Sequence, residues 1–208
     1  MNLKEIVRKE LLSEQGRKRD VIRKVIKDIV TVFKNEDEGE YFLPEYFEDR
    51  DEMVYDFMTM GESFSVELIM EINDEIESFK VNAEIYNEDH SIKLIIQYNS
   101  ENKNKILYDL IGELNEVIAH ELKHIDQNIR GMFVSKSYRG KDPVKYYTQP
   151  KELDAQVFGF KRLSKLTRKP FDEVVMNWFE THRDIHQLDD KGINKVTDRI
   201  FEYEKYRK

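Results

Sequence analysis

The chain has 208 residues, of which 39% are hydrophobic and 37% are charged, and its net charge at pH 7 is -8. The 12 Phe and 11 Tyr residues can fill the core of one sizeable domain, which excludes disorder of the whole chain. Cysteine is absent, so disulfides, thiolate metal sites and a cysteine nucleophile are excluded.

The same composition indicates which binding partner and which cellular compartment to expect for the protein. The acidic net charge argues against nucleic acid as the main partner. The basic residues within 17–27 are the only hint of such a partner, and a solvated helix face explains them more simply. No apolar run has the length of a signal peptide or of a membrane span. We therefore expect a soluble cytoplasmic protein without a membrane partner, acting in the host cytoplasm if a phage encodes it.

The first quarter of the chain is expected to be helical and then irregular. Apolar residues at helical spacing predict helices over residues 2–12 and 17–34. Residues 35–57 are rich in acidic side chains and are expected to form an irregular connector. We therefore expect an N-terminal part over residues 1–57 and a main domain over residues 58–208, which together form one compact unit.

Three strands are expected next. Apolar and polar residues alternate over 64–72, 79–85 and 92–98, and turn residues separate these runs at 73–74 and 87–90. Each run has one apolar face, as in a sheet that is buried on one side. The pattern predicts a three-stranded antiparallel meander and an α+β fold class.

Helices make up the rest of the expected structure. They are predicted over residues 103–130, 148–167, 170–186 and 190–206. Gly131 is a natural stop for the first of them. Thr148 is the expected N-cap of the second, with Pro150 in its first turn. A loop is expected over residues 132–147.

The predicted helix over 103–130 contains His120-Glu121-Leu122-Lys123-His124. Two histidines four residues apart lie on one helix face, so both imidazoles can reach one metal ion. Zinc lowers the pKa of a bound water toward about 7, and Glu121 can accept the proton of that water. This HExxH pattern predicts one zinc ion per chain and a hydrolase.

A catalytic zinc site needs a third protein ligand. In metzincins a glycine and a third histidine follow the motif, but the corresponding residues here are Gln127 and Arg130. The better candidate is Glu152, in the first turn of the next long helix, where small Ala155 allows the two helices to approach closely. Asp154 is the alternative third ligand, or else it orients a ligating histidine.

The sequence His-Glu-Leu-Lys-His followed by Glu-Leu-Asp-Ala resembles the gluzincin branch of the zincin-like metallopeptidases, in their minimal phage or bacterial form. The resemblance covers roughly residues 63–167. It implies zinc ligands His120, His124 and Glu152, with Glu121 as general base acting on a protein or peptide substrate. It also implies a zincin-like fold, in which a small antiparallel sheet packs on the motif helix.

The resemblance further implies that the strand over residues 91–98 is the sheet edge on which an extended peptide docks. Two residues depart from the family pattern. Zincin helices usually have an uncharged residue at the position of Lys123 and an apolar one at that of Asp126. Neither change touches a proposed ligand.

The remaining candidate residues carry weaker signals. Tyr146 and Tyr147 precede the Glu152 helix, and one of them can donate a hydrogen bond to an oxyanion, although a packed tyrosine is the simpler interpretation. We choose Tyr147 as the candidate. His182 and His186 are also four residues apart, but no glutamate follows His182. We interpret them as helix-surface histidines rather than as an oxyanion donor or a second metal site.

Three other functions fit the same residues. The first is a catalytically inactive zincin-fold protein that binds a metal or a protein partner. The second is a regulatory protease with one dedicated protein target. The third is an autoinhibited enzyme whose acidic segment over residues 35–57 covers the cleft. The sequence does not determine the oligomeric state or the cleavage specificity.

Overall fold

A computed structural model describes residues 21–43, 55–57, 62–86, 90–133, 140–183 and 187–206. The chain forms two compact units, Met1–Asn115 and Glu116–Lys208. The expected helix over residues 2–12 lies outside the described residues, and so do residues 44–54 of the acidic connector. The expectation of an irregular connector is wrong for part of its described residues, because 39–42 and 55–57 form strands. The domain boundary expected after residue 57 also adjoins residues outside the described part, and it stays a prediction.

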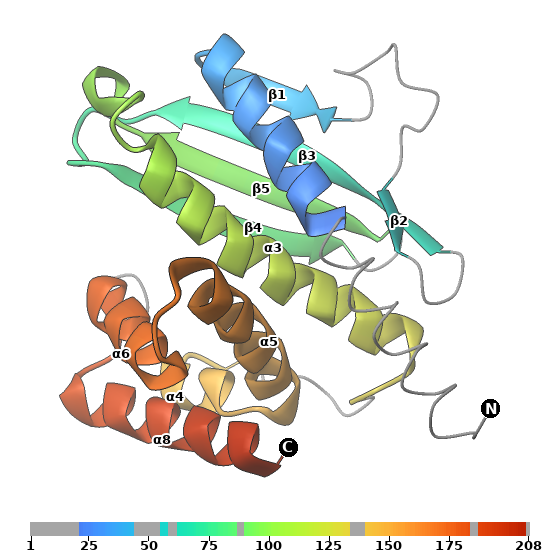
Figure 1. Cartoon of the computed structure of the whole chain (residues 1–208), viewed down its shortest axis with the longest axis vertical. Helices are drawn as coiled ribbons and strands as arrows, with labels where there is room; N and C mark the ends of the chain where they lie inside the picture. The colour runs from blue at the N-terminus through green and yellow to red at the C-terminus, as the bar shows by residue number, and fades with distance from the viewer. Residues whose placement is uncertain are drawn as a thin grey trace. The chain divides into compact units, whose positions relative to one another are not determined.

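The first unit contains a small mixed sheet (Figure 1). Its strands are β1 (Gly39–Phe42), β2 (Tyr55–Phe57), β3 (Glu62–Ile72), β4 (Phe79–Tyr86) and β5 (Ser91–Tyr98). Four of them follow the order β1-β3-β5-β4, and β2 pairs with the beginning of β3. The β3–β5 pair is parallel, and the other pairs are antiparallel.

The expected antiparallel meander is therefore wrong. Strand β5 lies between β3 and β4, so it is not a sheet edge, and the expected docking edge at residues 91–98 is wrong as well. The burial of each strand explains this order. The inward face of β5 is fully buried, as suits a central strand, whereas β4 alternates between half-buried and exposed residues, as suits an edge.

The expected strand faces are confirmed for β3 and β5, except that Ile72 at the end of β3 is exposed, and the apolar face of β4 is only half-buried. The fully buried residues of β3 and β5 recur at every second position. They are Phe64, Val66, Leu68, Met70, Ile92, Leu94, Ile96 and Tyr98. A helix over residues 21–35 packs on this face, because the rings of Phe33 and Tyr98 lie edge to face at 5.0 Å. The Tyr98 hydroxyl also donates a hydrogen bond to the backbone carbonyl of Asp37.

Helix α3 (Leu107–Ile129) follows the short 3-10 helix η1 (Ser100–Asn102). Its buried apolar residues recur every three or four positions, which explains why this segment is an amphipathic helix. They are Leu110, Leu114, Ile118, Leu122 and Ile125. The boundary between the two units falls within α3, after Asn115. Gly131 follows the helix with a φ of 60°, as expected for a C-terminal stop.

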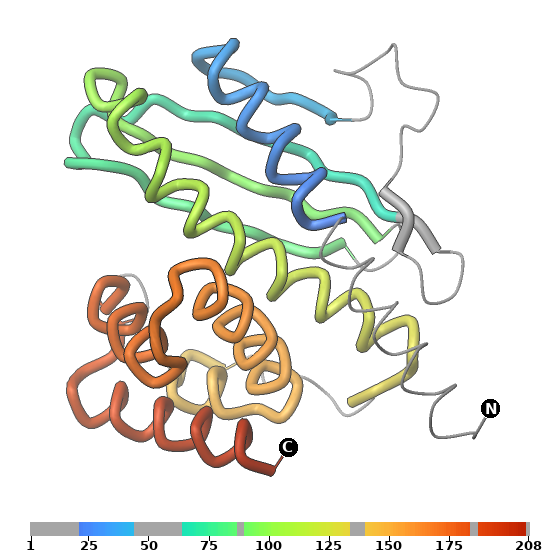
Figure 2. Tube along the Cα trace, viewed as in Figure 1, coloured from blue at the N-terminus to red at the C-terminus, as the bar shows by residue number. Residues whose placement is uncertain are grey.

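The second unit consists of the end of α3 and a helical bundle, seen in the Cα trace of Figure 2. The bundle helices are α4 (Pro143–Tyr147), α5 (Pro150–Thr167), α6 (Phe171–Thr181) and α8 (Asp190–Tyr206). Helix α5 packs against the other three through Val157, Phe160, Phe179 and further apolar side chains.

Several helix boundaries differ from the expectation: α3 begins at Leu107 rather than at residue 103, and α6 ends at Thr181 rather than at residue 186. Thr148 does not cap α5, because it ends α4, a short helix within the expected loop. Asp142 caps the beginning of α4 with its side chain, and Gln149 precedes Pro150 at the beginning of α5. Among the helices of the described residues, none is long and apolar enough to span a lipid bilayer.

Candidate metal centre

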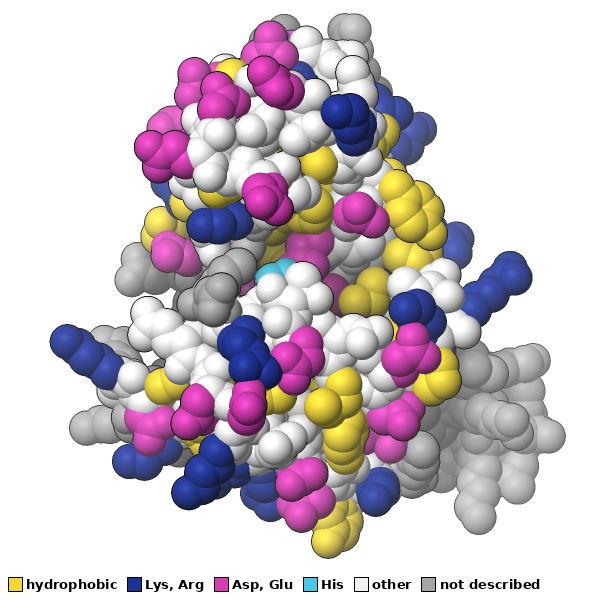
Figure 3. Space-filling view, turned by 90° about the vertical axis from the view of Figure 1, so that its left-hand side faces the viewer, with side chains coloured by type: hydrophobic (Ala, Val, Ile, Leu, Met, Phe, Trp, Pro, Cys, Tyr) yellow, Lys and Arg dark blue, Asp and Glu magenta, His cyan; other side chains and the backbone are white. Residues whose placement is uncertain are grey.

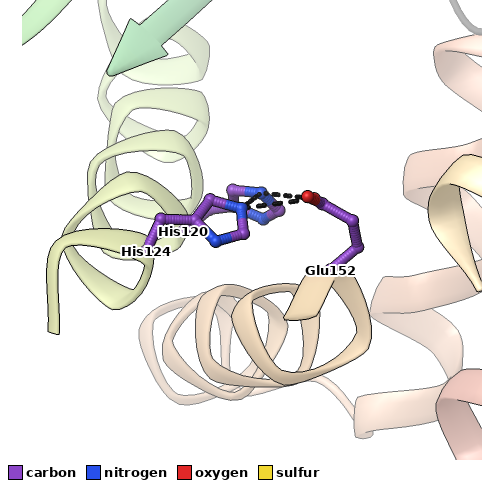
Figure 4. Close-up of side chains that lie close together, drawn as sticks. All are labelled: His120, His124 and Glu152. Atoms are coloured by element: carbon purple, nitrogen blue, oxygen red, sulfur yellow. Dashed lines mark hydrogen bonds and ion pairs between the residues drawn. The ribbon is translucent and has the colours of Figure 1, made fainter. Parts of the chain in front are cut away.

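Three side chains of the second unit converge on one point (Figure 4). His120 and His124 extend from α3, and Glu152 reaches them from α5. The two histidine Nε2 atoms lie 3.1 Å apart, and Glu152 Oε2 lies 3.2 Å from the Nε2 atom of His124 and 3.5 Å from that of His120. This group can hold a metal ion.

Local sequence explains these positions. The two histidines occupy successive turns of α3, so their rings lie on the same face of the helix. Pro150 begins α5 and places Glu152 in its first turn, where the partial positive charge of the helix terminus favours a carboxylate. The expected pairing of the HExxH helix with Glu152 is therefore present in the structure.

Burial and charge act against each other at these groups. Burial alone raises the pKa of Glu152, but hydrogen bonds with the two histidines outweigh it and lower that pKa well below its usual range. Burial likewise disfavours the charged form of His124, but the hydrogen bond with Glu152 and its charge raise the pKa of His124. The cluster thus favours an ionised carboxylate beside a positive charge.

Gln127, on the turn of α3 after His124, contacts the other side of the His124 ring. Its Oε1 atom lies 2.9 Å from His124 Nδ1. Its Nε2 atom donates to the backbone carbonyl of Lys151 and to Asp154 Oδ2, both at 3.0 Å. The Gln127 side chain therefore links His124, a candidate metal ligand, to the first turn of α5.

Asp154 is not among the clustered ligand atoms. Besides the hydrogen bond from Gln127, its Oδ2 atom forms an ion pair with Lys123 Nζ at 3.4 Å. Lys123 Nζ also contacts Asp126 Oδ2 at 2.8 Å, and Asp126 Oδ1 accepts from Arg130 Nε at 2.7 Å. The two residues that depart from the zincin pattern thus belong to one ionic network with Asp154.

Glu121, the expected general base, lies beside the cluster and is half-buried. Burial raises its pKa, and the positive charges of His120 and His124 partly oppose this effect. A carboxyl group with a raised pKa is closer to the range in which a group both accepts and releases a proton near neutral pH.

The two tyrosines of α4 differ in their surroundings. Tyr146 is 40% exposed. Burial raises the pKa of Tyr146, and the negative charges of Glu152 and Glu121 raise it further. The ring of Tyr147 packs edge to face on Phe179 at 5.8 Å, and burial raises its pKa as well. Both hydroxyl groups therefore stay protonated, as a hydrogen-bond donor requires.

The expected close approach of α3 and α5 also involves Gly159, a residue to which the sequence pattern does not point. A Cβ atom added to Gly159 would lie 2.7 Å from Glu116 Oε1 and 3.2 Å from the backbone oxygen of Glu116. Glu116 Oε1 in turn lies 4.0 Å from Nδ1 of His120, a candidate metal ligand. Ala155, the small residue noted in the sequence, is fully buried one turn earlier.

His182 lies apart from this cluster. The His182 ring stacks on Trp178 with centroids 4.6 Å apart, and its Nδ1 atom contacts the Trp178 carbonyl at 2.8 Å. His186 lies outside the described residues. On the face shown in Figure 3, acidic and basic side chains are interspersed, and a histidine side chain is visible from outside.

Comparisons with known proteins give no match. No protein-family model matches the chain, and no similar protein is found among curated sequences or among solved structures. A functional proposal must therefore rest on the arrangement of His120, His124 and Glu152.

Proposed function

We propose that this protein is a zinc-dependent peptidase of the zincin-like type, with His120, His124 and Glu152 as zinc ligands and Glu121 as general base. The observation that carries this proposal is the convergence of the three ligand atoms within 4.8 Å of one another. The position of Glu121 directly after the first ligand adds the carboxylate that the reaction requires.

The donor set and its spacing suit zinc. Ligand atoms at about 2.0–2.1 Å from a tetrahedral ion are separated from each other by about 3.3–3.4 Å. The three separations observed here are 3.1, 3.2 and 3.5 Å. Two imidazoles and one carboxylate also form the ligand set of thermolysin-type catalytic zinc sites, which leaves the fourth position for water.

The mechanism assigns a separate role to each side chain. A bound zinc ion supplies Lewis-acid catalysis and lowers the pKa of water. Glu121 accepts the proton of the attacking water and delivers it to the leaving amine. The Tyr146 hydroxyl group donates a hydrogen bond to the developing oxyanion. Tyr146 takes the role for which Tyr147 is the sequence-based candidate, because the charges of both Glu152 and Glu121 act on its hydroxyl group, whereas the Tyr147 ring packs on Phe179.

Elemental mass spectrometry of the purified full-length protein tests the metal site. We expect about one zinc ion per chain in the wild type and in His182→Ala, which changes a histidine outside the cluster. His124→Ala and Glu152→Ala should each lose the metal, because each removes one of three protein ligands. A wild-type protein that stays free of zinc after incubation with the metal would overturn the proposal.

The reaction requires a second test. Glu121→Gln should retain zinc but lose hydrolysis of a mixed peptide library, read by mass spectrometry, because the amide cannot accept the proton of water. A variant that retained both zinc and hydrolysis would contradict the role of Glu121. Zinc binding without hydrolysis in the wild type would instead favour the inactive metal-binding or protein-interaction module.

A further inference from the structure

We propose that Gln127 is a positioning residue that fixes the tautomer and the ring orientation of His124, and that Asp154 and Lys123 hold Gln127 in place. This inference rests on the proposed metal site. It assigns a function to residues on the far side of His124 from the ligand cluster, including Lys123, which departs from the usual pattern of the motif helix.

The orientation of the Gln127 amide follows from its partners. The Lys151 carbonyl and the Asp154 carboxylate can only accept hydrogen bonds, so the two 3.0 Å contacts must come from the amide N–H groups of Gln127. The Gln127 oxygen must therefore face His124 Nδ1, 2.9 Å away. This oxygen can only accept, so the Nδ1 atom of His124 must carry a proton.

The tautomer of His124 then follows. A neutral imidazole with its proton on Nδ1 has its lone pair on Nε2. The Nε2 atom is the one that faces His120 and Glu152, at 3.1 and 3.2 Å. Gln127 thus presents the lone pair of His124 to the ligand cluster. Metal-ligating histidines generally need such a partner on the other ring nitrogen.

Burial makes this hydrogen bond difficult to replace. Gln127 and Asp154 are both 0% exposed, so water has little access to either side chain. Two N–H groups of one buried amide are fixed by two acceptors on α5. Lys123, at 3.4 Å from Asp154, offsets the charge of this buried carboxylate. Removing the amide would leave buried polar groups of His124 and Asp154 without this partner.

The zinc affinity of the full-length protein, measured by competition with a chromogenic chelator, tests the inference. Gln127→Met keeps the approximate volume and removes the hydrogen bonds, and we expect zinc binding about 10–100-fold weaker than in the wild type. Gln156→Met is the matched control. Gln156 is also buried in this helix pair, and its amide has no hydrogen-bond partner among the described residues. We expect a change below about threefold for it.

An exchange of the hydrogen-bonding groups provides a rescue. In Gln127→Glu combined with Asp154→Asn, the carboxylate accepts from His124 Nδ1 and from the new amide, while the hydrogen bond to the Lys151 carbonyl is lost. This pair should therefore recover part of the zinc affinity and bind zinc at least about threefold more tightly than Gln127→Met combined with Asp154→Asn. A spectroscopic readout is the His124 Nδ1–H resonance of the zinc-loaded protein, which should shift in Gln127→Met.

The outcomes separate this inference from the proposed function. Absence of zinc binding in the wild type would overturn both. Wild-type zinc affinity and an unchanged Nδ1–H resonance in folded Gln127→Met would overturn only the role of Gln127. Circular dichroism of the metal-free variants establishes that they fold.

Discussion

The Nε2 atoms of His120 and His124 lie 3.1 Å apart, although the two rings come from successive turns of one helix. Two nitrogen lone pairs at this distance repel each other unless a proton or a cation lies between them. Glu152 adds a negative charge at 3.2 and 3.5 Å. The cluster is therefore arranged to receive a positive charge.

Zinc should stabilise the folded protein, because the site exists only when α3 and α5 are packed together. At a free zinc concentration of 100 times the dissociation constant, the gain is about 2.7 kcal/mol. Thermal unfolding with and without zinc measures this gain. His124→Ala should show no such increase, and magnesium should have little effect because it prefers oxygen ligands. Equal stabilisation of His124→Ala would place the bound zinc elsewhere.

The two neighbouring tyrosines should respond differently to loss of the hydroxyl group. Tyr146→Phe should lower kcat by about 10²–10³, the usual effect of removing an oxyanion donor. Tyr147→Phe keeps the ring that packs on Phe179 and should change kcat only a few-fold. Peptide hydrolysis by the two variants, at matched zinc content, provides the comparison. The reverse order of effects would return the oxyanion role to Tyr147.

Two helical glycines should respond in opposite directions to alanine. A Cβ atom at Gly112 meets nothing within 4 Å, so Gly112→Ala should stabilise α3 by about 0.5–1 kcal/mol. Gly159→Ala instead forces Glu116 to move, and overpacking of this kind typically costs about 1–3 kcal/mol. Urea denaturation measures both free energies of unfolding. A stabilised Gly159→Ala would contradict the close approach of α3 and α5.

Tyr98 should make the folded state sensitive to alkaline pH. Burial raises the pKa of Tyr98 from 10.0 to about 12, and the negative charge of Asp37 adds to this. Its contribution to stability is therefore fully present below pH 10 and is lost as the pH rises toward 12. Tyr98→Phe should be less stable at neutral pH by about 1 kcal/mol, but it should lose less stability between pH 10 and 12. Parallel slopes for the two proteins would contradict this assignment.

The sequence predicts those features that depend on periodicity within one element. The apolar residues of α3 recur at helical spacing, and the same spacing places His120 and His124 together. Alternation within β3 and β5 likewise predicts which residues are buried. Glu152 could be chosen because α5 begins at Pro150, a local signal for a helix start.

Features that depend on how elements meet could not be predicted in this way. Alternation in β5 is the same whether the strand is central or at an edge, so the sheet order was missed. Gln127 and Lys123 each also contact Asp154 on α5, more than twenty residues away in the chain. A glutamine just after the motif and a lysine inside it were unusual enough to notice in the sequence. Only the packing of α5 on α3 shows that both side chains contact Asp154.

The parallel pairing of β3 with β5 has a consequence for the order of folding. Strands β4 and β5 are consecutive and form a hairpin that closes a short loop, whereas β3 must pair with β5 across the whole of β4. Closing the longer loop costs more chain entropy, and non-local pairing slows folding. We therefore expect the β4–β5 hairpin to form early and β3 to pair with β5 later. The central β3–β5 pairing of the sheet should thus form after the pairing at its β4 edge.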